Sequence, residues 1–230
     1  MSSTKTATAI SNESVRLYQS ISEHGEVTSN YKYLPGSPKN YRFDGRTGDF
    51  NLGGVKPLGK KLSLQPIAFR FMEDELFARK SDSTGVVKRE LWAEVFFIDS
   101  NNAVSFIMFN NSSARQLQKL IESLFYEDVV ENGSLRSMEL MDVVLSISGE
   151  KKENDKGKYF VTSFEFEVAE NSKVLEYRQL CEDVQIFSRD TITQTAEIIL
   201  WSNSFPFACL PINVSLRDSY SDEHINKLLN

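Results

Sequence analysis

Histidine and cysteine are scarce in this chain, which limits the chemistry that it can perform. The 230 residues include only two histidines, His24 and His224, and two cysteines, Cys181 and Cys209. The histidines lie near opposite ends of the chain and the cysteines are 28 positions apart, so neither pair has metal-ligand spacing. A Ser-His-Asp or Cys-His centre would depend on one of those two histidines. We therefore predict no metal site, no cofactor, no catalytic residues and no enzymatic activity.

Long apolar runs are also absent. No stretch of about 18 apolar residues is available to span a membrane. The first ten residues lack the apolar core of a signal peptide, and two cysteines are too few for a disulfide framework. These absences predict a protein of the cytoplasm (the host cytoplasm if it is viral) with no membrane association.

One segment comes close to a phosphate-binding loop but lacks its essential parts. Residues 54–61 nearly match G-x-x-x-x-G-K-[ST], yet Lys61 stands where the metal-binding hydroxyl belongs and Pro57 removes a backbone N–H. The residues that follow are strand-like, whereas the motif needs a helix whose N-terminus holds the phosphate. We interpret the segment as a glycine turn that carries a lysine cluster, made of Lys56, Lys60 and Lys61.

What the chain does contain is a series of strand-like segments. Lys61–Met72 alternates in part between apolar and polar residues, and Pro66 predicts an edge, bulge or kink in it. Leu91–Ile98 and Ala103–Phe109 are rich in aromatic and β-branched residues, and residues 99–102 between them are typical of a hairpin turn. The first three predicted strands are therefore consecutive.

One amphipathic helix follows these strands. Ser113 is a favourable N-cap, and Gln116 three residues later completes a capping box. Apolar residues then recur at helical spacing, at Leu117, Leu120, Ile121, Leu124 and Phe125. We expect this helix to close one end of a barrel.

Two further strands complete the pattern. Met138–Ser148 and Lys158–Ala169 are strand-like, and the polar link between them at 149–157 predicts an exposed loop. The order β-β-β-α-β-β is that of an OB-fold. The fold class predicted is mainly β with helices: a five-stranded OB-like barrel over residues 51–170, after an irregular N-terminal arm over 1–50.

Residues 171–230 are predicted to form a C-terminal helical extension and tail. A three-to-four-residue apolar spacing favours a helix from about Asn171 to Ser188 and places Cys181 on its apolar side. Ile192–Trp201 fits a helix or a strand, and we favour a helix capped by Asp190.

Charge is distributed unevenly along the chain. The net charge is −6, but residues 1–65 carry nine Lys or Arg against five acids, and the remainder carries seventeen against 27. A basic segment on an acidic body can still bind phosphate, because affinity follows local charge. The candidate nucleic-acid-binding residues are therefore exposed cations and aromatic rings on the predicted barrel: Lys56, Lys60, Lys61, Arg70, Arg89, Trp92, Phe96, Phe106 and Tyr159. An alternative is that the arm and the flanking helices cover these aromatic rings.

Residues 50–170 resemble the OB-fold single-stranded DNA-binding proteins of phages and plasmids. The resemblance is carried by residues 92–99, 104–109 and 157–161, together with Ser113 at the start of the helix. It implies a protein that coats single-stranded DNA during replication or recombination. The C-terminus departs from the familiar bacterial pattern, because it lacks a long acidic tail with an apolar tip.

The leading hypothesis is therefore a non-enzymatic, sequence-tolerant single-stranded DNA-binding protein. Lysines and arginines would capture the backbone and aromatic rings would stack on bases. The alternative is a structural or assembly protein, such as a virion component, whose acidic body and extensions contact a protein neighbour. A protein partner or a second copy of the chain is compatible with either hypothesis.

Overall fold

The computed structural model describes residues 15–75, 89–131, 133–155 and 157–206. His224 and Cys209 lie outside these residues. Within the described residues, neither helix has the length and apolar character needed to cross a membrane.

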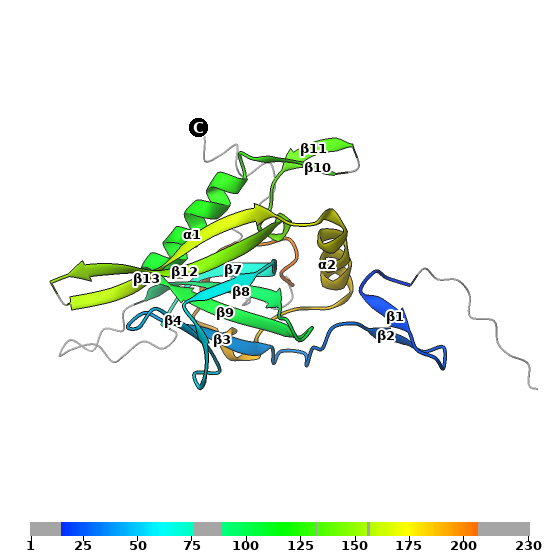
Figure 1. Ribbon diagram of the computed structural model, residues 1–230, viewed down its shortest axis with the longest axis horizontal. Coiled ribbons are helices and arrows are strands. Elements are labelled where there is room, and N and C mark those ends of the chain that lie inside the picture. The colour runs from blue at the N-terminus through cyan, green and yellow to red at the C-terminus, as the bar shows by residue number, and fades with distance from the viewer. Residues whose placement is uncertain (1–14, 76–88, 132, 156, 207–230) are drawn as a thin grey trace, which may run out of the picture.

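A seven-stranded sheet forms the centre of the fold (Figure 1). Its order is β14-β7-β8-β9-β3-β4-β5, antiparallel except where β3 runs parallel to β9. The strands are β3 (Lys39–Asp44), β4 (Asp49–Leu52), β5 (Lys56–Gly59), β7 (Pro66–Asp74), β8 (Glu90–Ile98), β9 (Val104–Asn110) and β14 (Glu197–Trp201). The predicted N-terminal arm thus supplies strands to this sheet, and the boundary expected after residue 50 falls inside β4.

A second sheet of three strands has the order β13-β12-β6. Its strands are β6 (Lys61–Leu64), β12 (Val143–Asn154) and β13 (Gly157–Val168). The strand predicted over Lys61–Met72 is divided at Gln65 between the two sheets, with a register shift beside Pro66. The kink expected from this proline is confirmed.

Two short hairpins complete the strands. They are formed by β1 (Gln19–Ile21) with β2 (Val27–Ser29), and by β10 (Asp128–Glu131) with β11 (Ser134–Ser137). The two α-helices are α1 (Asn111–Leu124) and α2 (Asn171–Asp183).

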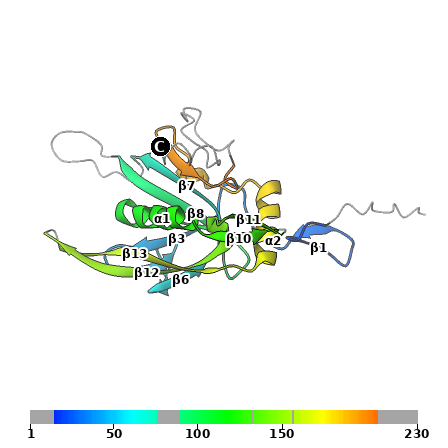
Figure 2. The ribbon, with the colours of Figure 1, turned by 90° about the horizontal axis from the view of Figure 1, so that it is seen from above.

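Helix α1 lies between the two sheets (Figure 2). Its buried residues Leu117, Ile121 and Leu124 pack with the inward side chains of both sheets, such as Val95 of β8 and Leu145 of β12. This first core explains the apolar spacing in the helix, because one helical face must be buried on each turn.

A second core covers the opposite face of the seven-stranded sheet. There Trp92, Phe96 and Phe106 pack against the N-terminal arm at Tyr31 and against α2 at Tyr177. The central strands β7, β8 and β9 are therefore buried on both faces, which explains why β8 is apolar on both of its sides.

The prediction of a closed five-stranded barrel is wrong, although the mainly-β class with helices is confirmed. The predicted strand order is present, with the hairpin β10–β11 added before β12. Closure would require β9 to pair with β13, but the free edge of β9 pairs with β3. The arm strand therefore extends the sheet where a barrel would close.

Three local predictions also need correction. Helix α1 begins at Asn111, ahead of Ser113, whose Oγ accepts a hydrogen bond from the Thr162 N–H at 3.0 Å. The predicted loop at 149–157 is mostly strand, because β12 and β13 pair from Val143 to Gly157. In the predicted C-terminal helical extension, α2 is confirmed but residues 197–201 form the strand β14.

Candidate nucleic-acid interface

Two of the predicted lysines, Lys60 and Lys61, lie beside the hairpin β12–β13, where Lys61 is opposite Ser148 of β12; the third, Lys56, is opposite Leu52 of β4. Lys56 opens β5, and Lys60 and Lys61 lie at the start of β6. All three are exposed. Within the described residues, neither Lys56 nor Lys61 takes part in an ion pair. These two ammonium groups are consequently available to a bound anion.

Lys60 is held by the turn between β3 and β4. Its ammonium group donates to the Thr47 carbonyl at 2.8 Å and pairs with Asp49 Oδ1 at 3.0 Å. The Lys60 hydrogen bond lowers the pKa of the Asp49 carboxyl group. The Lys60 side chain is therefore held in place, and Asp49 offsets part of its charge, which is not the case for Lys56 or Lys61.

The ring of Phe160 on β13 lies beside Lys60, whereas its strand neighbour Tyr159 points to the other face of β13. The Lys60 ammonium group is 5.7 Å from the centre of the Phe160 ring, a cation–π distance. The Phe160 ring packs on Gly48, and the Phe160 N–H donates to the Gly45 carbonyl at 2.7 Å. Tyr159 is half-buried and lies opposite Lys152 on β12. Lysines beside partly exposed rings are the groups that bind single-stranded nucleic acids.

The hairpin adds cations that the sequence prediction did not include. Lys151 pairs across the ladder with Phe160, as Lys152 does with Tyr159. The sequence assigned both lysines to an exposed loop. If the strand had been extended from β13 through a tight turn into residues 149–154, Lys151 and Lys152 would have been placed opposite Phe160 and Tyr159. We call Lys56, Lys60, Lys61, Lys151, Lys152, Tyr159 and Phe160 the basic surface. It includes both faces of the hairpin, because successive strand residues alternate: Lys151 and Phe160 lie on one face, and Lys152 and Tyr159 on the other.

Arg70 and Arg89, also predicted as binding residues, lie elsewhere. Arg70 is fully buried in the second core, where its Nε donates to Glu94 at 2.7 Å and its Nη2 to the Thr191 carbonyl at 2.7 Å. Arg89 donates to the carbonyl of Glu73 at 2.6 Å at the far end of β7. Arg70 is therefore corrected to an internal residue, and Arg89 is not part of the basic surface.

The predicted stacking residues Trp92, Phe96 and Phe106 are corrected in the same way. They are buried in the second core, and the rings of Phe96 and Phe106 stack on each other with centres 5.9 Å apart. The arm and α2 cover them, which is the alternative that the sequence left open. Of the four predicted aromatic residues, only Tyr159 lies outside this core, opposite Lys152 on β12.

No group of three or more His, Cys, Asp or Glu residues in the described part of the chain is arranged to hold a metal ion. Cys181 is partly buried against β7, where its Sγ lies 3.5 Å from the Ile67 carbonyl, and desolvation raises the pKa of its thiol to about 12. Such a thiol is not a reactive nucleophile at neutral pH.

Comparison with protein-family models, curated protein sequences and solved structures gives no match to this chain.

Proposed function

We propose that the protein binds single-stranded DNA through the basic surface, with little sequence preference, in DNA replication or recombination. The observation that carries the proposal is that lysines lie beside aromatic rings on both faces of the hairpin β12–β13: Lys60 and Lys151 beside Phe160 on one face, and Lys152 beside Tyr159 on the other. The amino-acid sequence separates Lys60 from Phe160 by about a hundred positions, and the fold brings them together.

The proposed binding is electrostatic at first. Lys56 and Lys61 contact backbone phosphates, because their charges are not paired within the described residues. Each phosphate contact releases condensed counterions, so affinity falls as salt rises. Lys60 holds the Phe160 ring in place and contributes a smaller share, because Asp49 already neutralises part of its charge.

Stacking then adds contacts that do not depend on base identity. Every base has a π-face, so a half-exposed ring accepts any base. Tyr159 presents such a ring beside Lys152, and Phe160 presents another beside Lys60. This combination would favour single-stranded over duplex DNA, because the faces of bases in a duplex are already covered by the neighbouring base pairs.

The lysines are tested by fluorescence anisotropy of a labelled oligo(dT) at low salt. The double variant Lys56→Gln/Lys61→Gln should bind about tenfold more weakly than the wild type, since it loses two phosphate contacts. The control Lys32→Gln/Lys119→Gln removes two exposed lysines elsewhere, and its affinity should stay within about twofold. Equal losses in both variants would mean that overall charge, and not this surface, attracts DNA.

The stacking residue is tested by Tyr159→Ala. Loss of one stacked base should weaken oligo(dT) binding by about 1–3 kcal/mol. Tyr126→Ala is the control, because it removes an exposed tyrosine that lies just after α1 and away from the hairpin β12–β13. An unchanged affinity for Tyr159→Ala, with the fold intact by circular dichroism, would remove Tyr159 from the site.

A further inference from the structure

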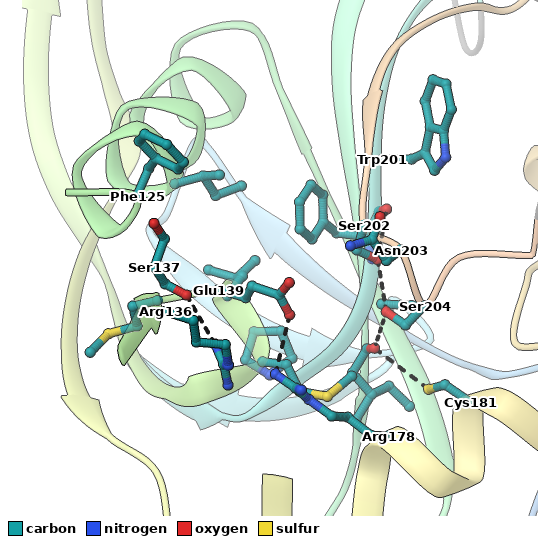
Figure 3. Close-up of a pocket in the computed structure, with 18 of the residues that line it drawn as sticks. Phe125, Arg136, Ser137, Glu139, Arg178, Cys181, Trp201, Ser202, Asn203 and Ser204 are labelled. Atoms are coloured by element: carbon teal, nitrogen blue, oxygen red, sulfur yellow. Dashed lines mark hydrogen bonds and ion pairs between the residues drawn. The ribbon is translucent and has the colours of Figure 1, made fainter. Parts of the chain in front are cut away.

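A large cavity lies on the far side of the molecule from the hairpin tip, where segments remote in sequence meet. Its volume is about 970 Å³, at the upper end of the range of ligand sites. The walls come from the ends of α1 and β11, the turn after β11, α2, and residues 201–204 (Figure 3). None of its lining residues belongs to the basic surface.

One wall of the cavity is apolar and extends beyond it. Ile121, Phe125 and Leu135 line the cavity. Leu135 is 69% exposed, and its cross-strand partner Val130 is 61% exposed. The ring of the exposed Tyr126 lies 5.4 Å from that of Phe125. Large apolar side chains that stay exposed together mark an interaction surface.

The two arginines in the cavity wall are already neutralised. Arg136 donates to both carboxylate oxygens of Asp142, at 2.6 and 2.7 Å, and to Glu131 at 2.6 Å. Arg178 donates to the other oxygen of Glu131 at 2.8 Å. Because carboxylates occupy both guanidinium groups, the wall has little attraction left for an anion.

Glu139 is only weakly compensated by the arginines of this wall. Its side chain is half exposed, and its contact with Arg178 is long, at 3.5 Å (Figure 3). Burial raises the pKa of Glu139; Arg178 opposes that rise and Asp142 adds to it. Asp128 and Glu182 also line the cavity, and no lysine does so in the described part of the chain. The site therefore favours a cation.

We propose that this cavity binds an extended segment of a partner protein that carries a large apolar side chain next to a lysine or arginine. The apolar side chain packs against Phe125 and Leu135, and the cation pairs with Glu139. A peptide fits better than a small molecule, because the apolar surface continues past the cavity to Tyr126 and Val130. In addition, β11 pairs only with β10 among the described strands, which leaves an edge for the peptide backbone.

The test is selection from a random peptide library displayed on phage, with the full-length protein as bait and the Glu139→Gln variant for counter-selection. Enriched peptides should contain an apolar residue beside Lys or Arg. When synthesised and labelled, they should bind Glu139→Gln about tenfold more weakly than the wild type. Glu165→Gln, which removes an exposed carboxylate on β13, should bind them as the wild type does.

A second variant tests the apolar half of the site. Leu135→Ser changes an exposed side chain, so the fold should survive, and the same peptides should bind it more weakly. Peptides that bind Glu139→Gln as well as the wild type, peptides rich in acids, or no enrichment at all would overturn the proposal. Self-association of the wild type that Glu139→Gln abolishes, seen by sedimentation, would assign the cavity to a second copy and also overturn it. The proposal does not depend on DNA binding.

Discussion

At the scale of single residues, burial decides which charged groups are structural. In the sequence, Arg70 lies within one predicted strand and Arg89 next to another, and neither position shows whether the cation is exposed. In the structure Arg70 is enclosed with Glu94 and Thr191, whereas Arg89 lies at the end of the sheet. The cross-strand register that pairs Arg70 with Glu94 depends on how β7 meets β8. No local pattern in either strand reveals that register, so the sequence could not identify Arg70 as internal.

Asp99 is the buried carboxylate that joins the arm to the β8–β9 turn. It accepts hydrogen bonds from Lys39 at 2.7 Å and Tyr41 at 3.2 Å on β3, and from the N–H groups of Asn101 and Ala103. Burial alone would raise the pKa of Asp99, but the Lys39 and N–H hydrogen bonds outweigh burial and lower it. The folded state therefore favours the ionised form.

This linkage gives a pH-dependent prediction. Asp99→Asn should lower the free energy of unfolding at pH 7 by about 1–3 kcal/mol, because the amide cannot accept every donor around it. Since the pKa of Asp99 is lower in the folded state, its contribution is complete above about pH 4 and is lost as the pH falls through the folded value. Urea unfolding at several pH values measures this.

The difference between Asp99→Asn and the wild type should shrink as the medium becomes more acidic. Asp128→Asn changes an exposed aspartate and should have little effect at any pH. A difference for Asp99→Asn that is constant from pH 7 to strongly acidic conditions would show that the ionised carboxylate is not what stabilises the turn.

At the scale of elements, the periodicity of the sequence predicted where strands and helices lie but not which strands pair with one another. β8, β9 and α1 were predicted well, because alternation and helical spacing are local properties. The parallel pairing of Lys39 with Ser105 joins segments far apart in the sequence, so it left no local signal. The strand β14 was predicted as a helix, because a short apolar run fits either structure until its neighbours are known.

The contact between the β3–β4 turn and the β12–β13 hairpin depends on one glycine. Gly48 has φ +75°, and a Cβ atom there would lie 2.6 Å from the Phe160 ring. Gly48→Ala should therefore destabilise the protein by about 1–3 kcal/mol through steric overlap added to backbone strain. Gly53→Ala is the control, because Gly53 also has a positive φ, +62°, but nothing lies within 4 Å. Equal unfolding midpoints for the two variants would contradict the close packing of this turn.

At the scale of the whole molecule, the layers of the fold explain which of the predicted site residues are exposed and which are internal. The three adjacent lysines were visible in the sequence because they are neighbours along the chain. The aromatic residues of β8 were misassigned, because sequence alone does not tell which elements cover a sheet face. The arm and α2 cover that face, and on the second sheet Lys60 contacts Phe160 while Tyr159 lies opposite Lys152.

The most direct measurement of the central claim is the affinity of the wild-type protein for oligo(dT) across a series of salt concentrations. A label on the DNA is required, because both tryptophans, Trp92 and Trp201, are buried in the second core. We predict measurable binding at low salt, with log K falling linearly against log salt by about 0.7 per phosphate contacted. Duplex DNA of the same length should bind more weakly. An absence of binding at low salt, where electrostatic attraction is strongest, would contradict the account and favour the assembly-protein alternative.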